Sequence, residues 1–246
     1  MRENYKNFSI NGYTAKRVVD ISNQDNGIEK WYEVKNSNLF SILFNPESAT
    51  WLKMVNDDEF NPRIEQSYQA QLAVLHLIGA DLLMQKCNLV EIGSKKGFTS
   101  PHFGETIESI IKARKRKTEI IYSEEDLNWF YYQGYLLAKE LLKESNWWMD
   151  DPNPGNIVIS DRNLNIKSEV VLIDFSNKNS RRKFSNTNIN ELEFSFNREA
   201  KKTGLNGWKY ICNIYSNGLI LNYDHTIINQ CGCFLCYCLS SAGVYY

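Results

Sequence analysis

The sequence predicts an α+β fold, with a strand-rich first part and a mainly helical second part. Short runs of strand-forming residues separated by turn residues dominate the first 60 positions, segment 62–79 changes to helical periodicity, and long helical stretches follow residue 104. Hydrophobic residues make up 43% of the 246 positions. That content is enough to bury the core of one large domain or of two small lobes.

Four strands are expected in the first part of the chain. Turn-forming clusters at 23–27 and 45–48 separate runs that are rich in β-branched and aromatic residues. The expected strands are 17–21, 31–34, 40–44 and 50–55.

One helix is expected to interrupt these strands. Pro62 suits its first turn, and Gly79 suits its end. Apolar residues recur between them at steps of three and four, as on one face of an amphipathic helix. They are Ile64, Tyr68, Leu72, Leu75 and Ile78. Segments 88–92 and 98–100 then return to strand composition.

The second part is expected to be mainly helical. Ser123 followed by three acidic residues predicts the start of a long helix. The expected helices are 106–113, 123–145 and 190–203, with two short strands at 157–159 and 170–173.

Composition excludes some classes of protein. Lys plus Arg number 28 and Asp plus Glu 29, so nothing indicates a basic nucleic-acid binder. The first residues are charged rather than a secretory signal, and no apolar run is long enough for a transmembrane segment. Four of the six cysteines lie in one short stretch, unlike a disulfide framework. These features predict a cytoplasmic protein.

Two loops carry a pattern that suits phosphoryl transfer. Asp151 precedes Asn156 by five positions, and Asp174 ends an expected strand 18 residues later. Phosphoryl transfer needs a carboxylate that orients the attacking hydroxyl and accepts its proton. It also needs hard oxygen ligands for Mg²⁺. Asp151 is the expected base, and Asn156 and Asp174 are the expected Mg²⁺ ligands.

With the Asp174-Phe175 pair, this pattern resembles the protein-kinase-like superfamily. The loop 154–156 is closer to aminoglycoside-phosphotransferase-like kinases than to ordinary protein kinases. Three residues depart from the usual pattern: Met149 replaces His, Asp150 replaces Arg, and Ser176 replaces Gly. The resemblance implies a two-lobed domain over 1–246 that binds ATP and Mg²⁺, with an N-lobe at about 1–103 and a C-lobe at about 104–246.

The resemblance also implies nucleotide-binding residues in the first lobe. Lys53 is expected to reach the phosphates, and Glu65 in the following helix is expected to pair with it, with Gln69 as an alternative. The loop at 35–41, with Ser37 and Asn38, is expected to cover the phosphates although it contains no glycine.

An adenine-holding hinge is expected at 101–105. Its backbone groups should face the base. His102 and Phe103 lie in the middle of this segment.

The resemblance leaves several functions open. An atypical protein Ser/Thr kinase is favoured, with a small-molecule kinase and a pseudokinase that acts as a binding module as alternatives. The short C-lobe is similar to those of kinases that bacterial pathogens secrete into host cells and of some viral kinases. That similarity adds the host cytoplasm as a possible location.

Two further segments have open interpretations. The basic run 112–117 is interpreted as a solvated linker or as a docking site for an acidic protein or an anionic ligand. The run Cys231–Cys238 is interpreted as buried or loosely ordered structure, with a zinc site and S-acylation as alternatives.

Overall fold

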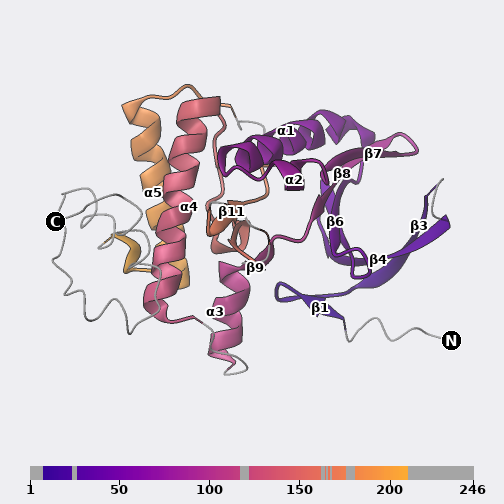
Figure 1. Cartoon of the computed structure of the whole chain (residues 1–246), viewed down its shortest axis with the longest axis horizontal. Helices are drawn as coiled ribbons and strands as arrows, with labels where there is room; N and C mark the ends of the chain where they lie inside the picture. The colour runs from indigo at the N-terminus through magenta and orange to yellow at the C-terminus, as the bar shows by residue number, and fades with distance from the viewer. Residues whose placement is uncertain are drawn as a thin grey trace. The chain divides into compact units, whose positions relative to one another are not determined.

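The computed structural model describes residues 8–23, 27–116, 122–161, 164, 166, 168–175 and 181–209. The chain up to Lys209 forms one compact unit, and its described part combines sheets and helices. The fold is therefore α+β, as predicted (Figure 1). The prediction that this domain extends to residue 246 falls on residues outside the described ranges.

A six-stranded antiparallel sheet forms the first part of the unit. Its spatial order is β3-β4-β5-β6-β8-β7, so only β7 and β8 exchange places relative to the sequence. All six strands overlap segments predicted to be strands. Their bounds are β3 (Arg17–Asn23), β4 (Gly27–Asn36), β5 (Phe40–Asn45), β6 (Thr50–Val55), β7 (Asn88–Ile92) and β8 (Lys95–Pro101).

Helix α1 (Asn61–Leu77) packs against this sheet (Figure 1). Ile64 joins Phe40, Val55 and Phe98 in one hydrophobic cluster. The predicted helix is confirmed, but its buried stripe is only partly right, because Tyr68 and Leu72 are half-buried. The residues buried on α1 are Ile64, Ser67, Ala70, Gln71, Val74 and Leu75. Two short helices flank it, η2 (Asp58–Phe60) and α2 (Asp81–Met84).

The second part is built around a three-stranded antiparallel sheet with β10 in its centre. The predicted helices and both predicted strands are present, although α5 begins earlier than expected. The elements are β9 (Gly104–Thr106), α3 (Ile107–Lys115), α4 (Glu124–Ser145), η3 (Pro154–Asn156), β10 (Ile157–Ser160), β11 (Val170–Leu172) and α5 (Asn186–Thr203).

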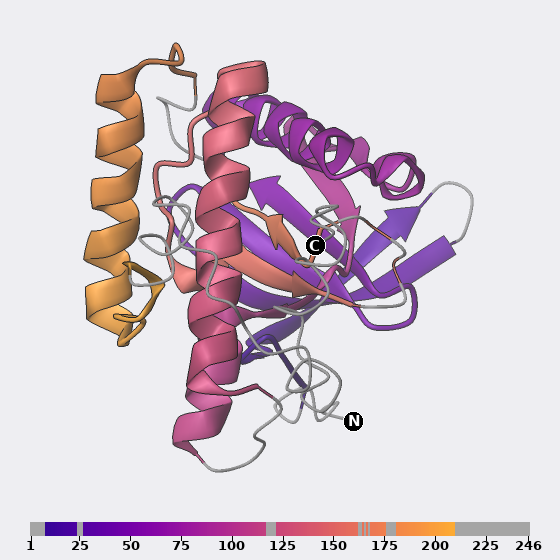
Figure 2. The same ribbon diagram turned by 60° about the vertical axis from the view of Figure 1, so that its left-hand side comes forward.

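Helix α4 organises this second part. Ser123 and Asp126 form a capping box at its start, in agreement with the predicted helix start. Gly134 lets the helix approach β10, because a Cβ there would lie 2.8 Å from the side chain of Ile157. On its other side α4 runs beside α5 (Figure 2).

A two-residue connection joins the two sheets. Strand β8 ends at Pro101, and β9 begins at Gly104. Gly104 has a φ of 140°, and a Cβ at this position would lie 2.1 Å from the carbonyl oxygen of Ile159. The close approach of β9 and β10 therefore requires glycine here.

A small hairpin precedes the large sheet. Its strands are β1 (Ser9–Ile10) and β2 (Tyr13–Thr14), which were not predicted. Among the helices that the structure describes, none is long and apolar enough to cross a membrane.

Candidate functional site

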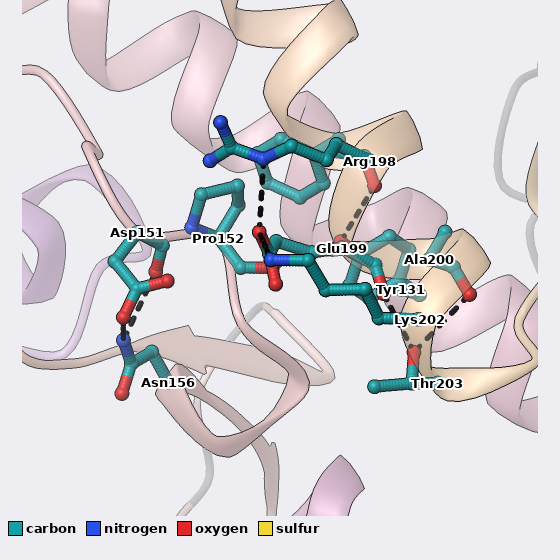
Figure 3. A network of polar contacts seen from close by, with 10 residues as sticks. Tyr131, Asp151, Pro152, Asn156, Arg198, Glu199, Ala200, Lys202 and Thr203 are labelled. Carbon is teal, nitrogen blue, oxygen red and sulfur yellow. Dashed lines mark hydrogen bonds and ion pairs between the residues drawn. The ribbon is translucent and has the colours of Figure 1, made fainter.

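The loop before β10 brings Asp151 and Asn156 together. The side chain of Asn153 accepts a hydrogen bond from the backbone N–H of Gly155 at 2.8 Å, which starts the short helix η3. Asn156 Nδ2 then donates to the carbonyl oxygen of Asp151 at 2.9 Å and to its Oδ2 at 3.3 Å (Figure 3). The nitrogen of the Asn156 amide thus holds the loop.

The segment after β11 places Asp174 beside this loop. The backbone N–H of Ile173 donates to the carbonyl oxygen of Asn156 at 3.0 Å. Asp174 has a left-handed backbone with a φ of 65°, and its Oδ1 forms an ion pair with Lys53 Nζ. Lys53 comes from β6 and is 8% exposed, and its ammonium also lies 4.6 Å from the centre of the Phe40 ring. Residues 121 positions apart therefore meet at one point.

Lys53, Asn156 and Asp174 line one cavity between the two sheets. The cavity has a volume of about 110 Å³, and Gln71 and Thr106 also contribute to its lining. The rest of its wall is largely apolar. The apolar side chains in the wall are Ile42, Trp51, Phe98, Phe103, Val158 and Ile173. Apolar walls with a few convergent polar groups are typical of ligand-binding cavities.

The predicted ion pair between Lys53 and Glu65 is wrong. Glu65 forms its ion pair with Lys96 at 2.5 Å, whereas Lys53 pairs with Asp174. Gln69, the alternative, is exposed. Neither residue lies on the buried side of α1, because that side carries Ser67 and Gln71 instead.

Ser67 and Gln71 are the residues of α1 that sequence reasoning missed. Ser67 Oγ donates to the carbonyl oxygen of Phe175 at 2.7 Å, and Gln71 Nε2 donates to that of Leu172 at 3.2 Å. These two bonds flank Asp174 on both sides in the sequence. A polar pair four positions apart within an otherwise apolar helical stripe was the signal that could have revealed them.

The expected hinge segment connects the two sheets, but two of its backbone groups already form hydrogen bonds within the protein. The backbone N–H of His102 donates to the carbonyl oxygen of Ala49 at 2.8 Å, and the carbonyl oxygen of Phe103 accepts from the N–H of Asp161 at 2.8 Å. Those two groups do not face a base, which corrects the expectation for them. The Phe103 side chain does line the cavity, whereas the His102 ring accepts a hydrogen bond from Trp51 Nε1 at 3.2 Å.

The expected phosphate-covering residues do not line the cavity. Ser37 closes the turn between β4 and β5 through bonds to Phe40, and its carbonyl oxygen accepts from Asn56. Asn38, its neighbour, is exposed. The polar groups of Ser37 are used for hydrogen bonds within the turn and to Asn56. Within the expected loop 35–41, Lys35 is the residue that lines the cavity.

The environment of Asp151 suits a proton acceptor. Partial burial of its carboxyl group raises its pKa, and the charges of Glu199 and Asp174 add to that shift. Hydrogen bonds from the backbone of Asn153 and from the Asn156 amide oppose it. A raised pKa makes the carboxylate a better base.

Helix α5 supports the Asp151 loop from its other side (Figure 3). Tyr131 Oη lies 2.8 Å from the carbonyl oxygen of Pro152 and 2.9 Å from that of Phe196, so it links α4, the loop and α5. Glu199 is buried and forms ion pairs with Arg198 at 3.1 Å and Lys202 at 2.7 Å.

A second, open hollow of about 530 Å³ lies beside this loop. Asp150, the neighbour of Asp151, lines it together with Trp148, Arg182 and one face of α5 that includes Phe194. The Arg182 guanidinium lies 4.1 Å from the centre of the Trp148 ring. Phe194 is 67% exposed.

Among the described residues, the basic run 112–117 and the cysteine run 231–238 contribute none to the site described above. Lys112, at the start of the basic run, pairs with Glu108 at 2.9 Å, and residue 117 is outside the described ranges. The cysteine run 231–238 also lies outside them.

In the comparisons with known proteins, no family model and no curated protein matched the sequence.

Proposed function

We propose that the chain is an ATP- and Mg²⁺-dependent phosphotransferase with a two-lobed, protein-kinase-like fold and a protein hydroxyl as its acceptor. The convergence of Lys53, Asn156 and Asp174 on one cavity carries this proposal. Their chemistry fits the group that would bind, since a cation can neutralise phosphate oxygens and two hard oxygen donors suit Mg²⁺. The ion, when bound, neutralises charge on the transferred phosphoryl group.

The residues of the chain have separable roles in this proposal. Asp151 accepts the proton of the acceptor hydroxyl. At the same time, the oxygen of that hydroxyl bonds to the γ-phosphorus, and the bond between this phosphorus and the leaving ADP breaks. Lys53 binds phosphate oxygens. Asn156 and Asp174 are the residues that would hold Mg²⁺.

The observed conformation must open before a nucleotide binds. A volume of about 110 Å³ is below the several hundred Å³ of typical ligand pockets. In addition, Lys53 already occupies one oxygen of Asp174. Binding of Mg²⁺ to Asp174 and of phosphate oxygens to Lys53 would therefore compete with the Lys53–Asp174 ion pair.

The open hollow beside Asp150 supports a large acceptor. Its volume and its exposed Phe194 suit a polypeptide segment better than an enclosed small molecule. The small volume of the cavity favours a second candidate function, a pseudokinase that acts as a binding module without phosphoryl transfer.

Labelled ATP tests the proposal directly. The purified chain is incubated with γ-labelled ATP, Mg²⁺ and a cell lysate, and transfer to protein, lipid and small molecules is measured. Asp151→Asn should reduce transfer by about 10²–10⁴-fold because the general base is lost. Asp174→Asn should abolish Mg²⁺-dependent transfer.

Asp81→Asn is the matched control, because Asp81 is an exposed carboxylate on α2. It should transfer label like the wild type. Absence of label in every fraction would support the binding module instead, and full activity of the Asp174 variant would exclude the proposed mechanism.

A further inference from the structure

The hairpin β1–β2 has a turn that its two central residues determine. Asn11 and Gly12 have φ angles of 50° and 73°, and the strands pair Ile10 with Tyr13 across them. A two-residue hairpin turn with positive φ at both positions favours Asn-Gly. The turn therefore explains the backbone at Asn11, but it gives no role to the side chain.

This hairpin lies between the large sheet and helix α3 (Figure 1). Next to its first strand, the ring of Phe8 stacks on Tyr32 at 4.6 Å and on Phe44 at 5.8 Å. At its tip, a Cβ on Gly12 would lie 3.5 Å from the side chain of Ser109. The segment from Phe8 to Gly12 thus contacts both parts of the molecule that enclose the cavity.

Asn11 and Tyr13 line the same cavity as Lys53 and Asp174. Asn11 Oδ1 is buried, and it has no hydrogen-bond partner. In the part of the chain that the structure describes, Asn128 Oδ1 and Trp208 Nε1 share this property, but neither residue lines the cavity. A buried acceptor without a donor costs free energy, so a ligand that supplied a donor to Asn11 Oδ1 would recover that cost.

The chemistry of this acceptor excludes the phosphates as its partner. Ionised phosphate oxygens only accept hydrogen bonds, whereas an amide oxygen needs an N–H or O–H donor. The nucleoside offers such donors in the exocyclic amine of adenine and in the ribose hydroxyls. A carboxamide also pairs with adenine through two parallel hydrogen bonds.

We propose that the side-chain amide of Asn11 binds the nucleoside end of the nucleotide, and that the β1–β2 hairpin forms the wall that recognises it. This inference rests on the proposed function and adds a nucleoside-recognition residue to it. The apolar rings of Trp51 and Phe103 in the same cavity suit the flat face of a base. Lys53, Asn156 and Asp174 remain for the phosphates.

Calorimetric titration of the full chain tests this assignment. Asn11→Gly removes the amide while a residue that adopts positive φ stays in the turn. It should weaken ATP binding about fivefold to tenfold, as expected for one lost hydrogen bond. Its affinity for inorganic triphosphate with Mg²⁺ should equal that of the wild type. Thr14→Ala, exposed on the same hairpin, should bind both probes normally.

Further probes separate the two donors. If Asn11 reads the base, the wild type prefers ATP over GTP and Asn11→Gly loses that preference. If it reads the sugar, the wild type discriminates against 2′- or 3′-deoxy-ATP and the variant does not. Unchanged ATP binding, or equal losses for ATP and inorganic triphosphate, overturns the assignment. A wild type that binds no nucleotide contradicts the proposed function itself.

Discussion

Asp174 combines a strained backbone with a directed charge. A φ of 65° is uncommon for a residue with a side chain, and Asp is among the residues that tolerate it. Asp174 lies two residues after the end of β11, and its carboxylate pairs with Lys53. Residues held in sparsely populated conformations cluster at functional sites. The strain at Asp174 thus fits a residue selected for where its carboxylate points.

His102 gives a prediction about pH and stability. Burial lowers its pKa from 6.5, although the nearby charges of Glu105 and Asp161 oppose the shift. Trp51 Nε1 donates to its Nδ1, so protonation at that nitrogen breaks a hydrogen bond. Because the unfolded chain takes up the proton at a higher pH, stability should fall as pH drops below about 6.5 toward the folded pKa. Above that range the contribution is fully present.

Urea denaturation at about pH 7.5 and about pH 5.5 measures this effect. His102→Gln should lose less stability between the two pH values than the wild type does. His76→Gln, at an exposed position, is the control and should behave like the wild type. Equal pH dependence in the wild type and in His102→Gln would contradict the prediction.

At the scale of elements, α1 is attached to the Asp174 segment by hydrogen bonds rather than by an ion pair. Ser67 and Gln71 are both buried. Ser67 donates to the carbonyl oxygen of Phe175, the residue after Asp174, and Gln71 donates to that of Leu172, two residues before it. The position of the helix is therefore coupled to the position of that carboxylate.

Removing both donors should loosen this attachment. In Ser67→Ala/Gln71→Ala the carbonyls of Leu172 and Phe175 lose their donors, which should cost about 1–3 kcal/mol per site in unfolding free energy. Under the proposed phosphotransferase function, the Mg²⁺ concentration that gives half-maximal transfer should rise more than the ATP concentration that gives half-maximal transfer. Gln69→Ala, on the exposed side of α1, should change neither value. A double variant with normal Mg²⁺ dependence would mean that the two residues stabilise the fold without positioning Asp174.

The sequence predicted the longer elements well and the shortest ones poorly. Helix α4 and strands such as β6 carry a clear period and clear end signals. The two-residue strands β1 and β2 have no period to detect, and an Asn-Gly turn between such short runs is easily missed.

In the candidate site, residues that lie close together in the sequence were predicted, whereas contacts between distant residues were not. The sequence pointed to Asp151, Asn156 and Asp174 as candidates because all three lie within one short stretch of sequence. Glu65 was assigned wrongly because a carboxylate was expected opposite Lys53. The partners of Ser67 and Gln71 are backbone carbonyls more than 100 positions away, which no helical pattern reveals. The orphan acceptor of Asn11 depends likewise on tertiary packing.

At the scale of the whole molecule, aromatic packing closes the compact unit near its end. Trp208 is fully buried, with ring centres 5.9 Å from Tyr131, 5.5 Å from Tyr135 and 6.2 Å from Phe196. Large aromatic side chains contribute strongly to core stability. The unit therefore depends on residues that follow the last turn of α5.

Two truncations test this dependence. A chain that ends at Lys209 keeps Trp208 and should unfold in one cooperative transition. A chain that ends at Gly204 loses Leu205 and Trp208, and should lose about 3–5 kcal/mol or more of unfolding free energy because a core aromatic residue is removed. Thermal unfolding followed by circular dichroism compares the two, and equal stability would show that the Trp208 cluster is dispensable.

The position of Trp51 has a spectroscopic consequence. Its indole forms part of the cavity wall and donates to a histidine that titrates, whereas the other five tryptophans do not line that cavity. Indole emission responds to changes in polarity and in hydrogen bonding. A change in emission on ligand addition that disappears in Trp51→Phe would therefore report binding at this cavity in the otherwise intact chain, with no label attached.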